Sequence, residues 1–526
     1  MLSERISKCK DVRIAVIGLG YVGLPLALQL AKKGFSVVGV DINQRIIDEI
    51  KVGRSTIEGI SPEQILEAVR VNQTLMPLKV DAEPNNNTAE TLKALVGIDV
   101  FIICVQTPLH RERGWEPETH WIRKSAQLIC RIGEEEEKSS RLPRERLIIL
   151  ESTTYPGTTR TIFSKVCERF SQKGTQCLLA YSPERTSPGP NSHGDPIGQA
   201  ASGTSTFEIT RIVGGADEVS CETARALYQT IFRRVHSVES LEAAELIKLV
   251  ENTFRFISIG FANEMARVSR SFGLNIWDII EAVKTKGFGL DLCLPGLIGG
   301  HCLPIDPHYL GWAYRNRRSI ATFVDVAERS HQDARRDALD LIIRLLSQHD
   351  KGVPKSSILF FGVAYKKDVG DIRESGVLDL MKKLYSYGAR LSFWDPVRAR
   401  QSVKHDLHLN FSEAERRQLS KPALERLVEQ PDGQSFVKPQ ELDGDWKSVR
   451  DKVLGTDFDC VVLATDHTDF HSAYTELFSS KNSPPVVDIN NAAEFWLRTA
   501  ELTSAQRDEI KQTMHDRSRY MLFGHN

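Results

Sequence analysis

The chain has 526 residues, of which 41% are hydrophobic and 26% are charged, and its formal net charge at pH 7 is −1. A chain of this length predicts two to four domains. The balanced charge predicts no broad basic surface for nucleic acid and no polybasic patch for a membrane surface. No stretch approaches the roughly 18 apolar residues of a membrane-spanning helix. We therefore expect neither nucleic-acid nor membrane binding, whereas a local basic cluster could still bind a small anionic ligand.

The nine cysteines are scattered along the chain without the CxxC or CxxH spacing of a zinc site. An odd, unpatterned number of cysteines is typical of reduced thiols in an intracellular protein. The first residues also lack the pattern of a secretory signal. We therefore expect a cytoplasmic protein with free thiols, no disulfide framework and no bound metal.

The first third of the chain has the pattern of a dinucleotide-binding fold. A β-branched run from Val12 to Ile17 predicts a buried strand, and the glycine-rich turn GLGYVG, a helix and a second strand ending at Asp41 follow it. Gly18 makes the tight turn, Gly20 admits a pyrophosphate and Gly23 lets the helix pack closely on the strand. Asp41 can accept hydrogen bonds from ribose hydroxyls and would repel a 2′-phosphate. The pattern therefore predicts NAD rather than NADP.

Polar residues follow the later strands of this predicted sheet. A strand ending near Val105 is followed by Gln106-Thr107-Pro108, and a strand ending at Leu150 is followed by Glu151-Ser152-Thr153. An open α/β sheet binds its ligand at the carboxyl ends of its strands, although each of these segments could instead cap a helix. Glu184 follows a third apolar run and is either a base or a charge at a helix N-terminus. We expect 131–146 to be a solvated insertion and 187–206 to be a loop.

The middle of the chain is predicted to be helical from Glu218, with one long helix ending near Ser271. Lys248 and Asn252 share a face of this helix, and their apolar neighbours favour a functional or paired lysine over a solvated one. Further helices are predicted at 277–283 and 309–344.

A cysteine lies between these helices in the segment GGHCLPIDP, which begins at Gly299. The glycines allow backbone to approach a ligand closely. A helical turn after Cys302 would place Cys302 and Asp306 on one face. Cys302 is either a buried structural thiol or a nucleophile, and a nucleophile needs polar or cationic neighbours. The cofactor pattern and the basic residues elsewhere in the chain favour the nucleophile.

The last third predicts a second βαβ unit, with strands at 357–361 and 390–394 around a helix at 377–387. It lacks the glycine fingerprint, so we expect a Rossmann-like fold that binds something other than NAD. Lys366, Lys367 and Arg373 follow its first strand and could meet phosphates.

The predicted fold class is therefore α/β, with two Rossmann-like doubly wound domains joined by a central helical region. The expected parts are an NAD-binding domain at 1–210, a helical dimerisation domain at 211–335, a second Rossmann-like domain at 336–500 with an insertion at 398–456, and a polar tail at 501–526.

The chain resembles the UDP-glucose/GDP-mannose dehydrogenase family from about residue 12 to residue 495. Seven motifs in order carry the resemblance: IAVIGLGYVGLPLA, CVQTPL, ESTTYPGTT, YSPER, AELIKLVENTFR, GGHCLPIDPHYL and GVAYKKDVGDIRES. The resemblance implies a two-step, four-electron oxidation of a sugar C6 hydroxymethyl group to a carboxylate with two NAD+. It also implies a UDP-sugar substrate that the domain at 336–500 binds, a role in polysaccharide biosynthesis, and a homodimer or larger homo-oligomer.

The family's motifs imply a role for each matching residue. The implied catalytic residues are Cys302, the nucleophile that carries a thiohemiacetal and then a thioester; Lys248 and Asp306, which handle protons and steady the oxyanion; Asn252 and Thr153, which hold sugar and water; and Glu184, the base of thioester hydrolysis.

The same motifs imply two sets of ligand contacts. The implied NAD contacts are Gly18, Gly20, Tyr21, Val22, Gly23, Asp41, Thr107, Pro108, Thr153 and Arg373, the last reaching the NAD site of a neighbouring subunit. The implied substrate contacts are Glu184, Lys248, Asn252, Lys286, Gly299, Tyr365 and Lys366, with Lys286 near a residue that crosses to the partner's substrate.

The ESTTYPGTT and GGHCLPIDPHYL motifs resemble the branch that oxidises UDP-N-acetylglucosamine to UDP-N-acetylglucosaminuronate. UDP-N-acetylmannosamine and UDP-glucose are the alternative substrates. The chain departs from the family's common pattern at three positions. Gln106 replaces a proline, Pro188 stands where some relatives carry a second acid, and Asn490 replaces an arginine that contacts the substrate.

Two other functions fit the same fold. A non-catalytic nucleotide-sugar sensor is disfavoured because Cys302, Lys248 and Asp306 are all present. A two-electron NAD dehydrogenase that does not use the cysteine would form one NADH per sugar instead of two.

Overall fold

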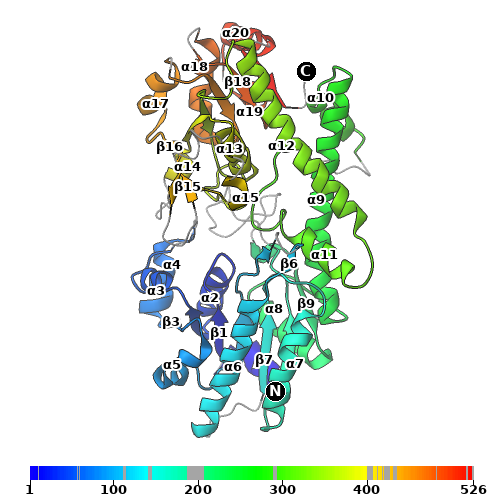
Figure 1. The fold of residues 1–526 in the computed structure, drawn as a ribbon. Helices are drawn as coiled ribbons and strands as arrows, with labels where there is room; N and C mark the ends of the chain where they lie inside the picture. The colour runs from blue at the N-terminus through cyan, green and yellow to red at the C-terminus, as the bar shows by residue number, and fades with distance from the viewer. Residues whose placement is uncertain are drawn as a thin grey trace. The chain divides into compact units, whose positions relative to one another are not determined.

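A computed structural model describes residues 1–526 except 10, 56, 58–59, 111–113, 140–144, 186–205, 288–292, 400–406, 412, 417–418, 420–426, 430–434, 456, 481–482, 501, 517–518 and 524–526. The loop expected at 187–206 lies outside the described residues apart from Thr206, and so does Pro188. The chain divides into two compact units, Met1–Asn252 with Ile305–Ala321 and Thr253–Pro304 with Thr322–Asn526. Each unit contains a sheet covered by helices, as predicted for an α/β protein (Figure 1).

The first unit is built on a sheet with the strand order β10-β9-β8-β7-β4-β1-β2-β3. The strands from β8 to β3 are mutually parallel, whereas β9 runs antiparallel to β8 and β10 runs parallel to β9. The sheet therefore extends past residue 210, where the sequence suggested a boundary. Its strands are β1 (Arg13–Ile17), β2 (Ser36–Asp41), β3 (Leu75–Lys79), β4 (Val100–Ile103), β7 (Glu145–Leu150), β8 (Gln176–Tyr181), β9 (Arg211–Gly215) and β10 (Val235–Val238).

The central strands β1, β4 and β7 are apolar and buried on both faces, as is typical of a parallel sheet covered by helices on both sides. Ile14 and Val16 belong to a core shared with α2 and α8, whereas Ala15 and Ile17 belong to a core shared with α6 and α7. A two-stranded ribbon of β5 (Leu109–His110) and β6 (Glu116–Pro117) follows β4. The helices of this unit are α1 (Leu2–Ser7), α2 (Gly23–Lys32), α3 (Gln44–Lys51), α4 (Pro62–Leu66), α5 (Ala89–Ala94), α6 (His120–Ser139), α7 (Thr158–Ser171), α8 (Glu218–Gln229), the first part of α9 (Leu241–Ser271), and α11 (Asp306–Arg315).

The second unit is built on a parallel sheet with the strand order β16-β12-β11-β17-β18-β19. Its strands are β11 (Ser357–Phe361), β12 (Arg390–Trp394), β16 (Gln440–Glu441), β17 (Cys460–Leu463), β18 (Val486–Asp488) and β19 (Tyr520–Leu522). A separate antiparallel sheet of β13 (Leu409–Phe411), β15 (Ser435–Val437) and β14 (Val428–Glu429) lies in the predicted insertion. The end of the predicted polar tail is therefore part of the main sheet, because β19 pairs with β18.

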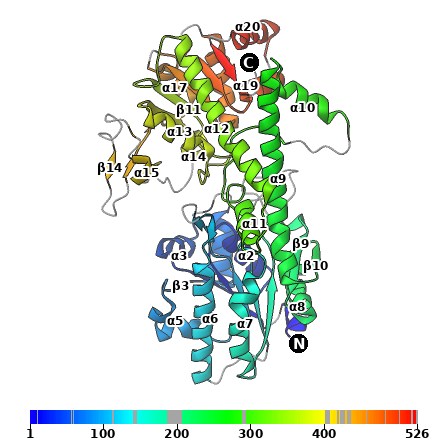
Figure 2. The same cartoon turned by 45° about the vertical axis from the view of Figure 1, so that its right-hand side comes forward.

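The helices of the second unit are the rest of α9, α10 (Ile276–Lys284), α12 (Thr322–Gln348), α13 (Gly376–Ser386), α14 (Pro396–Ala399), α15 (Glu413–Arg416), α17 (Trp446–Val453), α18 (His471–Ser479), α19 (Ala492–Thr499) and α20 (Ser504–His515). Gly260 of α9 allows α12 to approach closely, since a Cβ at Gly260 would lie 3.2 Å from the Cα of Ala327. Figure 2 shows α9 and α12 side by side.

A buried ion pair corrects the sequence prediction for residues 131–146. We expected residues 131–146 to form a solvated insertion, but α6 continues to Ser139 and its Glu136 is fully buried with Arg146. The guanidinium donates to both carboxylate oxygens of Glu136, at 2.7 and 2.9 Å, and to the carbonyl oxygen of Ile98. A run of acidic residues suggested solvent exposure, but a buried carboxylate is tolerated where an arginine pairs with it.

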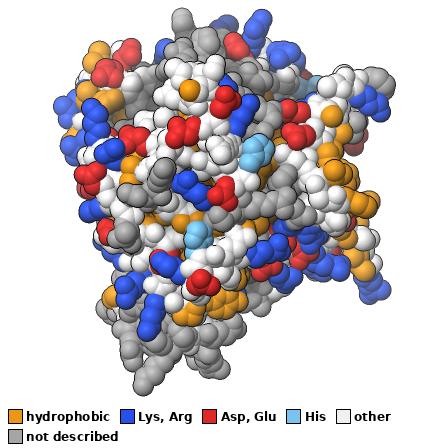
Figure 3. Space-filling view, turned by 90° about the horizontal axis from the view of Figure 1, so that it is seen from above, with side chains coloured by type: hydrophobic (Ala, Val, Ile, Leu, Met, Phe, Trp, Pro, Cys, Tyr) orange, Lys and Arg blue, Asp and Glu red, His pale blue; other side chains and the backbone are white. Residues whose placement is uncertain are grey.

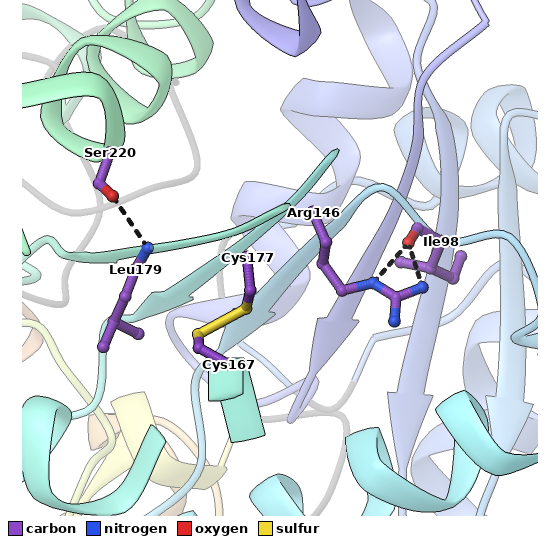
Figure 4. Close-up of a disulfide and its surroundings, with 6 residues drawn as sticks. All are labelled: Ile98, Arg146, Cys167, Cys177, Leu179 and Ser220. Atoms are coloured by element: carbon purple, nitrogen blue, oxygen red, sulfur yellow. Dashed lines mark hydrogen bonds between the residues drawn. A yellow bond between two sulfur atoms is a disulfide. The ribbon is translucent and has the colours of Figure 1, made fainter. Parts of the chain in front are cut away.

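The prediction that the cysteines are all free thiols is wrong for two of them. Cys167 of α7 and Cys177 of β8 form a disulfide, with their Cα atoms 5.0 Å apart (Figure 4). The turn between α7 and β8 returns the chain alongside itself, which brings these residues together without a recognisable motif spacing. The other seven cysteines, Cys302 among them, are not disulfide-bonded.

On the face shown in Figure 3, acidic and basic side chains are interspersed, in keeping with the net charge of −1. Among the residues that the structure describes, no helix combines the length and the apolar composition needed to cross a membrane.

Candidate functional site

The glycine-rich turn between β1 and α2 has the geometry of a dinucleotide cradle. Gly18 has φ +94°, and a Cβ there would lie 2.5 Å from the carbonyl oxygen of Cys104. A Cβ at Gly23 would overlap the carbonyl oxygen of Gly18, so this glycine is required for helix and strand to pack. At Gly20, by contrast, nothing lies within 4 Å of the Cβ position. The turn is therefore tight where the chain packs on itself and open where a pyrophosphate would approach.

Asp41, at the end of β2, holds the glycine-rich turn in place. Its Oδ2 accepts a hydrogen bond of 2.8 Å from the backbone N–H of Leu19, and its Oδ1 accepts one of 2.8 Å from that of Asn43. A carboxylate oxygen has more than one acceptor direction, so these contacts are compatible with further bonds from a ribose. Tyr21 is exposed and Val22 is half-buried at the N-terminus of α2.

The segments after β4 and β7 meet at the carboxyl edge of the first sheet. The Thr107 hydroxyl donates to the carbonyl oxygen of Thr153 at 2.8 Å, and Tyr309 of α11 donates to the carbonyl oxygen of Thr107 at 2.5 Å. Pro108 and Thr153 are both half-buried. These contacts fix both segments where an open α/β sheet binds ligands.

Three of the predicted catalytic residues are brought together by α9 and α11. Asn252 donates through Nδ2 to Oδ2 of Asp306 at 2.5 Å, and Lys248 lies one turn before Asn252 on α9. All three side chains are buried, with exposed fractions of 6% for Lys248, 8% for Asn252 and 2% for Asp306. Burial raises the pKa of Asp306 to about 6, although the charge of Lys248 and the hydrogen bond from Asn252 act to lower it. The cluster can therefore hold and release a proton near neutral pH.

The expected helical turn after Cys302 is absent, and α11 begins only at Asp306. Pro304 disfavours the helical conformation for Leu303, whereas Pro307 fits the first turn of a helix. Asp306 therefore occupies the first position of α11, while Cys302 lies in the preceding turn.

Glu184, in the segment after β8, contacts a buried arginine that the sequence did not single out. Nη1 of Arg211 lies 3.0 Å from Oε2 of Glu184. The sequence feature that could have pointed to Arg211 is its place as a charged residue at the start of the apolar run RIVGG.

A second residue that the sequence analysis missed is Glu245 of α9. It is fully buried and accepts hydrogen bonds from the N–H groups of Gly157 (2.5 Å) and Thr159 (2.8 Å) and from the Thr159 hydroxyl (2.6 Å).

In the second unit, the glycines before Cys302 pack against Tyr365. A Cβ at Gly299 would lie 2.5 Å from the Cβ of Tyr365, and a Cβ at Gly300, where φ is +86°, would lie 2.8 Å from its ring. The N–H of Gly300 donates to the carbonyl oxygen of Arg373 at 3.0 Å. The cysteine segment and the segment after β11 are therefore fitted to each other. Cys302 itself is half-buried.

The remaining predicted contacts of the second unit have varied surroundings. Lys366 is half-buried, and burial together with Arg255 lowers the pKa of its ammonium group. Arg373 binds Asp371, with distances of 3.0 Å from Nε and 2.7 Å from Nη2. Lys286 is exposed beyond the end of α10. Asn490 donates to the carbonyl oxygen of Ala464, so it joins the ends of β17 and β18.

Among the described residues, no group of three or more His, Cys, Asp or Glu side chains is arranged to hold a metal ion.

Three models of one family match the chain in succession. The NAD-binding domain of the UDP-glucose/GDP-mannose dehydrogenase family matches residues 12–232, its central domain matches residues 242–332, and its UDP-binding domain matches residues 359–494. Together the three matches span most of the chain in the order expected for the family.

Individual proteins show the same likeness. UDP-N-acetyl-D-mannosamine dehydrogenase of Methanocaldococcus jannaschii is 33% identical over 388 residues, which is 73% of this chain and 79% of that protein. UDP-N-acetyl-D-glucosamine 6-dehydrogenase of Pseudomonas aeruginosa is 27% identical over 76% of this chain and 86% of its own length. The solved structure of UDP-D-ManNAc dehydrogenase from Pyrococcus horikoshii is 25% identical, with a TM-score of 0.71 over 98% of this chain and 99% of that one.

Proposed function

The chain belongs to the UDP-glucose/GDP-mannose dehydrogenase family, and from this premise we propose that it oxidises the C6 hydroxymethyl group of a UDP-sugar to a carboxylate in two NAD-dependent steps. The observation that carries the proposal is the succession of NAD-binding, central and UDP-binding domains along one chain. The buried group of Lys248, Asn252 and Asp306 supports it, because oxidation of an alcohol requires a residue that takes up a proton.

The residues of the first unit fit NAD. The open position at Gly20, the close packing at Gly23 and the carboxylate of Asp41 correspond to the pyrophosphate, the helix–strand contact and the ribose of a dinucleotide. Tyr21, Val22, Thr107, Pro108 and Thr153 would line the cofactor. NAD+ supplies the acceptor for the two hydrides that the reaction removes, one in each step.

The chain's own groups would carry the covalent chemistry. In the proposed reaction, the group of Lys248 and Asp306 takes up the proton of the C6 hydroxyl while the aldehyde forms. The Cys302 thiolate then attacks the aldehyde carbon to give a thiohemiacetal, which is oxidised to a thioester. The Lys248 ammonium would stabilise the negative oxygen. Asn252 and Thr153 would hold the sugar and the water, and Glu184 would accept a proton from the water that releases the acid.

We propose a UDP-N-acetylhexosamine as the substrate. The ESTTYPGTT and GGHCLPIDPHYL motifs predict UDP-N-acetylglucosamine. UDP-N-acetylmannosamine, which differs in configuration at C2, is the second candidate because several relatives carry its name. Tyr365, Lys366, Lys286 and Gly299 are the proposed contacts for the nucleotide-sugar in the second unit.

We propose that the protein acts as a homodimer. Exposed apolar side chains recur on one side of α9, where Phe254 is 65%, Phe261 48% and Val268 42% exposed, and Phe272, directly after the end of the helix, is 75% exposed. Such a row of large apolar groups on a long helix favours contact with another protein surface. Arg373 and Lys286 are the residues proposed to act across the dimer interface.

A substrate panel tests the proposal. NADH formation is measured with UDP-N-acetylglucosamine, UDP-N-acetylmannosamine, UDP-glucose and GDP-mannose, and the product of each is identified by mass. We expect two NADH per sugar and an acid product from one of the two N-acetylhexosamines. One NADH per sugar with an aldehyde product would favour a two-electron dehydrogenase. Binding of UDP-sugars without any NADH would favour a sensor.

A further inference from the structure

Arg211 of the first unit is buried and contacts Glu184, the proposed base of thioester hydrolysis. Its side chain is 2% exposed, and its guanidinium contacts Ser182, Glu184 and Glu151. Nε donates to the Ser182 hydroxyl at 2.7 Å, Nη1 to Oε2 of Glu184 at 3.0 Å, and Nη2 lies 2.5 Å from Oε2 of Glu151. Its central carbon lies 4.8 Å from the centre of the Tyr228 ring and 5.1 Å from that of Phe232.

The direction of β9 explains how this arginine reaches the functional edge of the sheet. Arg211 is the first residue of β9, and the first residue of a parallel strand would lie at the opposite edge. However, β9 is antiparallel to β8, with Tyr181 opposite Gly214. Its beginning therefore lies beyond the end of β8, where the segment carrying Ser182 and Glu184 leaves the sheet. Figure 2 shows β9 and β10 beside α8.

The contacts of Arg211 leave its guanidinium little freedom. Glu151, which is fully buried, also accepts a hydrogen bond from the Tyr228 hydroxyl at its other carboxylate oxygen, Oε1. The Ser182 hydroxyl donates in turn to the carbonyl oxygen of Ile212 at 2.7 Å. A planar guanidinium held by a buried carboxylate, a hydroxyl and two aromatic rings is a rigid support for one further carboxylate. That further carboxylate is Glu184, whose side chain is 16% exposed.

We propose that Arg211, fixed by Glu151 and Tyr228, is the positioning residue that holds Glu184 in place for hydrolysis of the thioester on Cys302. The inference rests on the proposed function and concerns only the last step of that reaction. In this step the oxygen of a water molecule bonds to the thioester carbon, and a proton of the water passes to Glu184. The carbon–sulfur bond breaks, the electron pair returns to the sulfur of Cys302, and the acid leaves. The hydride transfers precede this step and do not use Glu184.

The test uses Arg211→Lys in the full chain, with the UDP-N-acetylhexosamine that the wild type oxidises. Lysine keeps the charge but cannot contact Ser182, Glu184 and Glu151 at once. We expect a rapid formation of about two NADH per subunit followed by a steady state reduced about 10- to 100-fold, the scale of a misplaced reacting group. Intact-protein mass spectrometry after rapid quenching should show the sugar acyl group on Cys302. Glu184→Gln, which removes the base, should show the same adduct.

Arg146→Lys is the matched control. Arg146 is also buried, pairs with a buried carboxylate and lies against two aromatic rings, but its partner Glu136 has no role in the proposed reaction. We expect Arg146→Lys to be less stable than the wild type, but to show neither an initial burst of NADH nor an acyl adduct on Cys302. Should Arg211→Lys fail to fold, Tyr228→Phe decides, since it removes only the hydroxyl that holds Glu151; an adduct on this variant supports the proposal, and normal turnover without one overturns it.

Two results separate the inference from the proposed function. An adduct with Glu184→Gln but none with Arg211→Lys overturns the role of Arg211 and leaves the proposed function standing. A wild type that forms no NADH with any sugar of the panel overturns the proposed function itself.

Discussion

At the scale of single residues, Cys302 has the largest proposed role, and the structure gives it the surroundings of a loop fitted to its neighbours. The glycines before it pack closely on Tyr365, since a Cβ at Gly299 would collide with the Cβ of Tyr365 and one at Gly300 would collide with its ring. This close packing fixes the backbone of the segment although it is neither helix nor strand. The half-buried thiol is therefore presented by a fixed turn and not by a helix face.

We expect Cys302→Ser to abolish formation of the acid while NAD and UDP-sugar binding persist. A serine hydroxyl without its own base is a far poorer nucleophile than a thiolate. The expected loss in kcat is at least ~10³, equivalent to at least ~4 kcal/mol of barrier. Steady-state NADH formation and product mass measure the loss, and ligand-induced thermal shifts serve as the binding control. Near wild-type turnover with two NADH per sugar would return Cys302 to a structural role.

At the scale of elements, Glu245 joins α9 to the N-terminus of α7. Its carboxyl group accepts from the N–H groups of Gly157 and Thr159, which have no partner within the first turn of α7. Burial raises its pKa from 4.5 to about 7, although the hydrogen bonds from Thr159 and Gly157 act to lower it. We therefore expect the connection between the two helices to weaken as the pH rises.

The sign of this sensitivity gives a prediction for Glu245→Gln. Because the pKa is raised on folding, the folded state binds the proton more tightly than the unfolded chain does. The stabilisation of the folded state by the protonated Glu245 is complete below about pH 4.5 and is lost as the pH rises through about 7. The full effect is on the order of 3 kcal/mol. We expect the wild-type Tm to fall between pH 5 and pH 8 more steeply than that of the neutral variant.

Glu242→Gln is the control for this measurement. Glu242 lies on the same helix, but its pKa is lowered by Arg160, which donates to it at 2.7 Å. Removing its charge should not flatten the fall in Tm between pH 5 and pH 8. Parallel pH profiles for the wild type and Glu245→Gln would contradict the role assigned to Glu245.

At the scale of the whole molecule, the exposed apolar row on α9 is the feature that a single chain does not explain. Phe254, Phe261 and Val268 recur at intervals of seven residues, which keeps them on one side of the helix. Phe323 and Val326 of α12 are also exposed, at 75% and 45%. We interpret these residues as the contact surface of the proposed homodimer.

We expect Phe261→Asp to convert the dimer to a monomer, because a desolvated carboxylate at an apolar contact is costly. Size-exclusion chromatography with light scattering should give twice the chain mass of 59.1 kDa for the wild type and a single chain mass for the variant. Tyr387→Asp, at a residue that is exposed outside this row, should remain dimeric. A wild type that is monomeric and fully active at working concentration would rule out the proposed assembly.

Local sequence determined much of the fold and part of the site. The strand at 13–17, the glycine-rich turn and the strand ending at Asp41 were predictable, because hydrophobic period and the steric demands of glycine act within a few residues. The pairing of Lys248 and Asn252 on one helix face followed from helical geometry. The proposed chemistry of Cys302 came from its motif and not from its surroundings.

Only the tertiary structure decided the contacts between residues far apart in the chain. The direction of β9 is set by pairing with β8, and this direction alone brings Arg211 to Glu184. Likewise, Glu136 is buried because Arg146 meets it, and the disulfide of Cys167 depends on the turn between α7 and β8. The position of a charged or sulfur-containing side chain in the sequence does not indicate which distant residue it will contact. Its role therefore depends on which distant residue the fold places beside it.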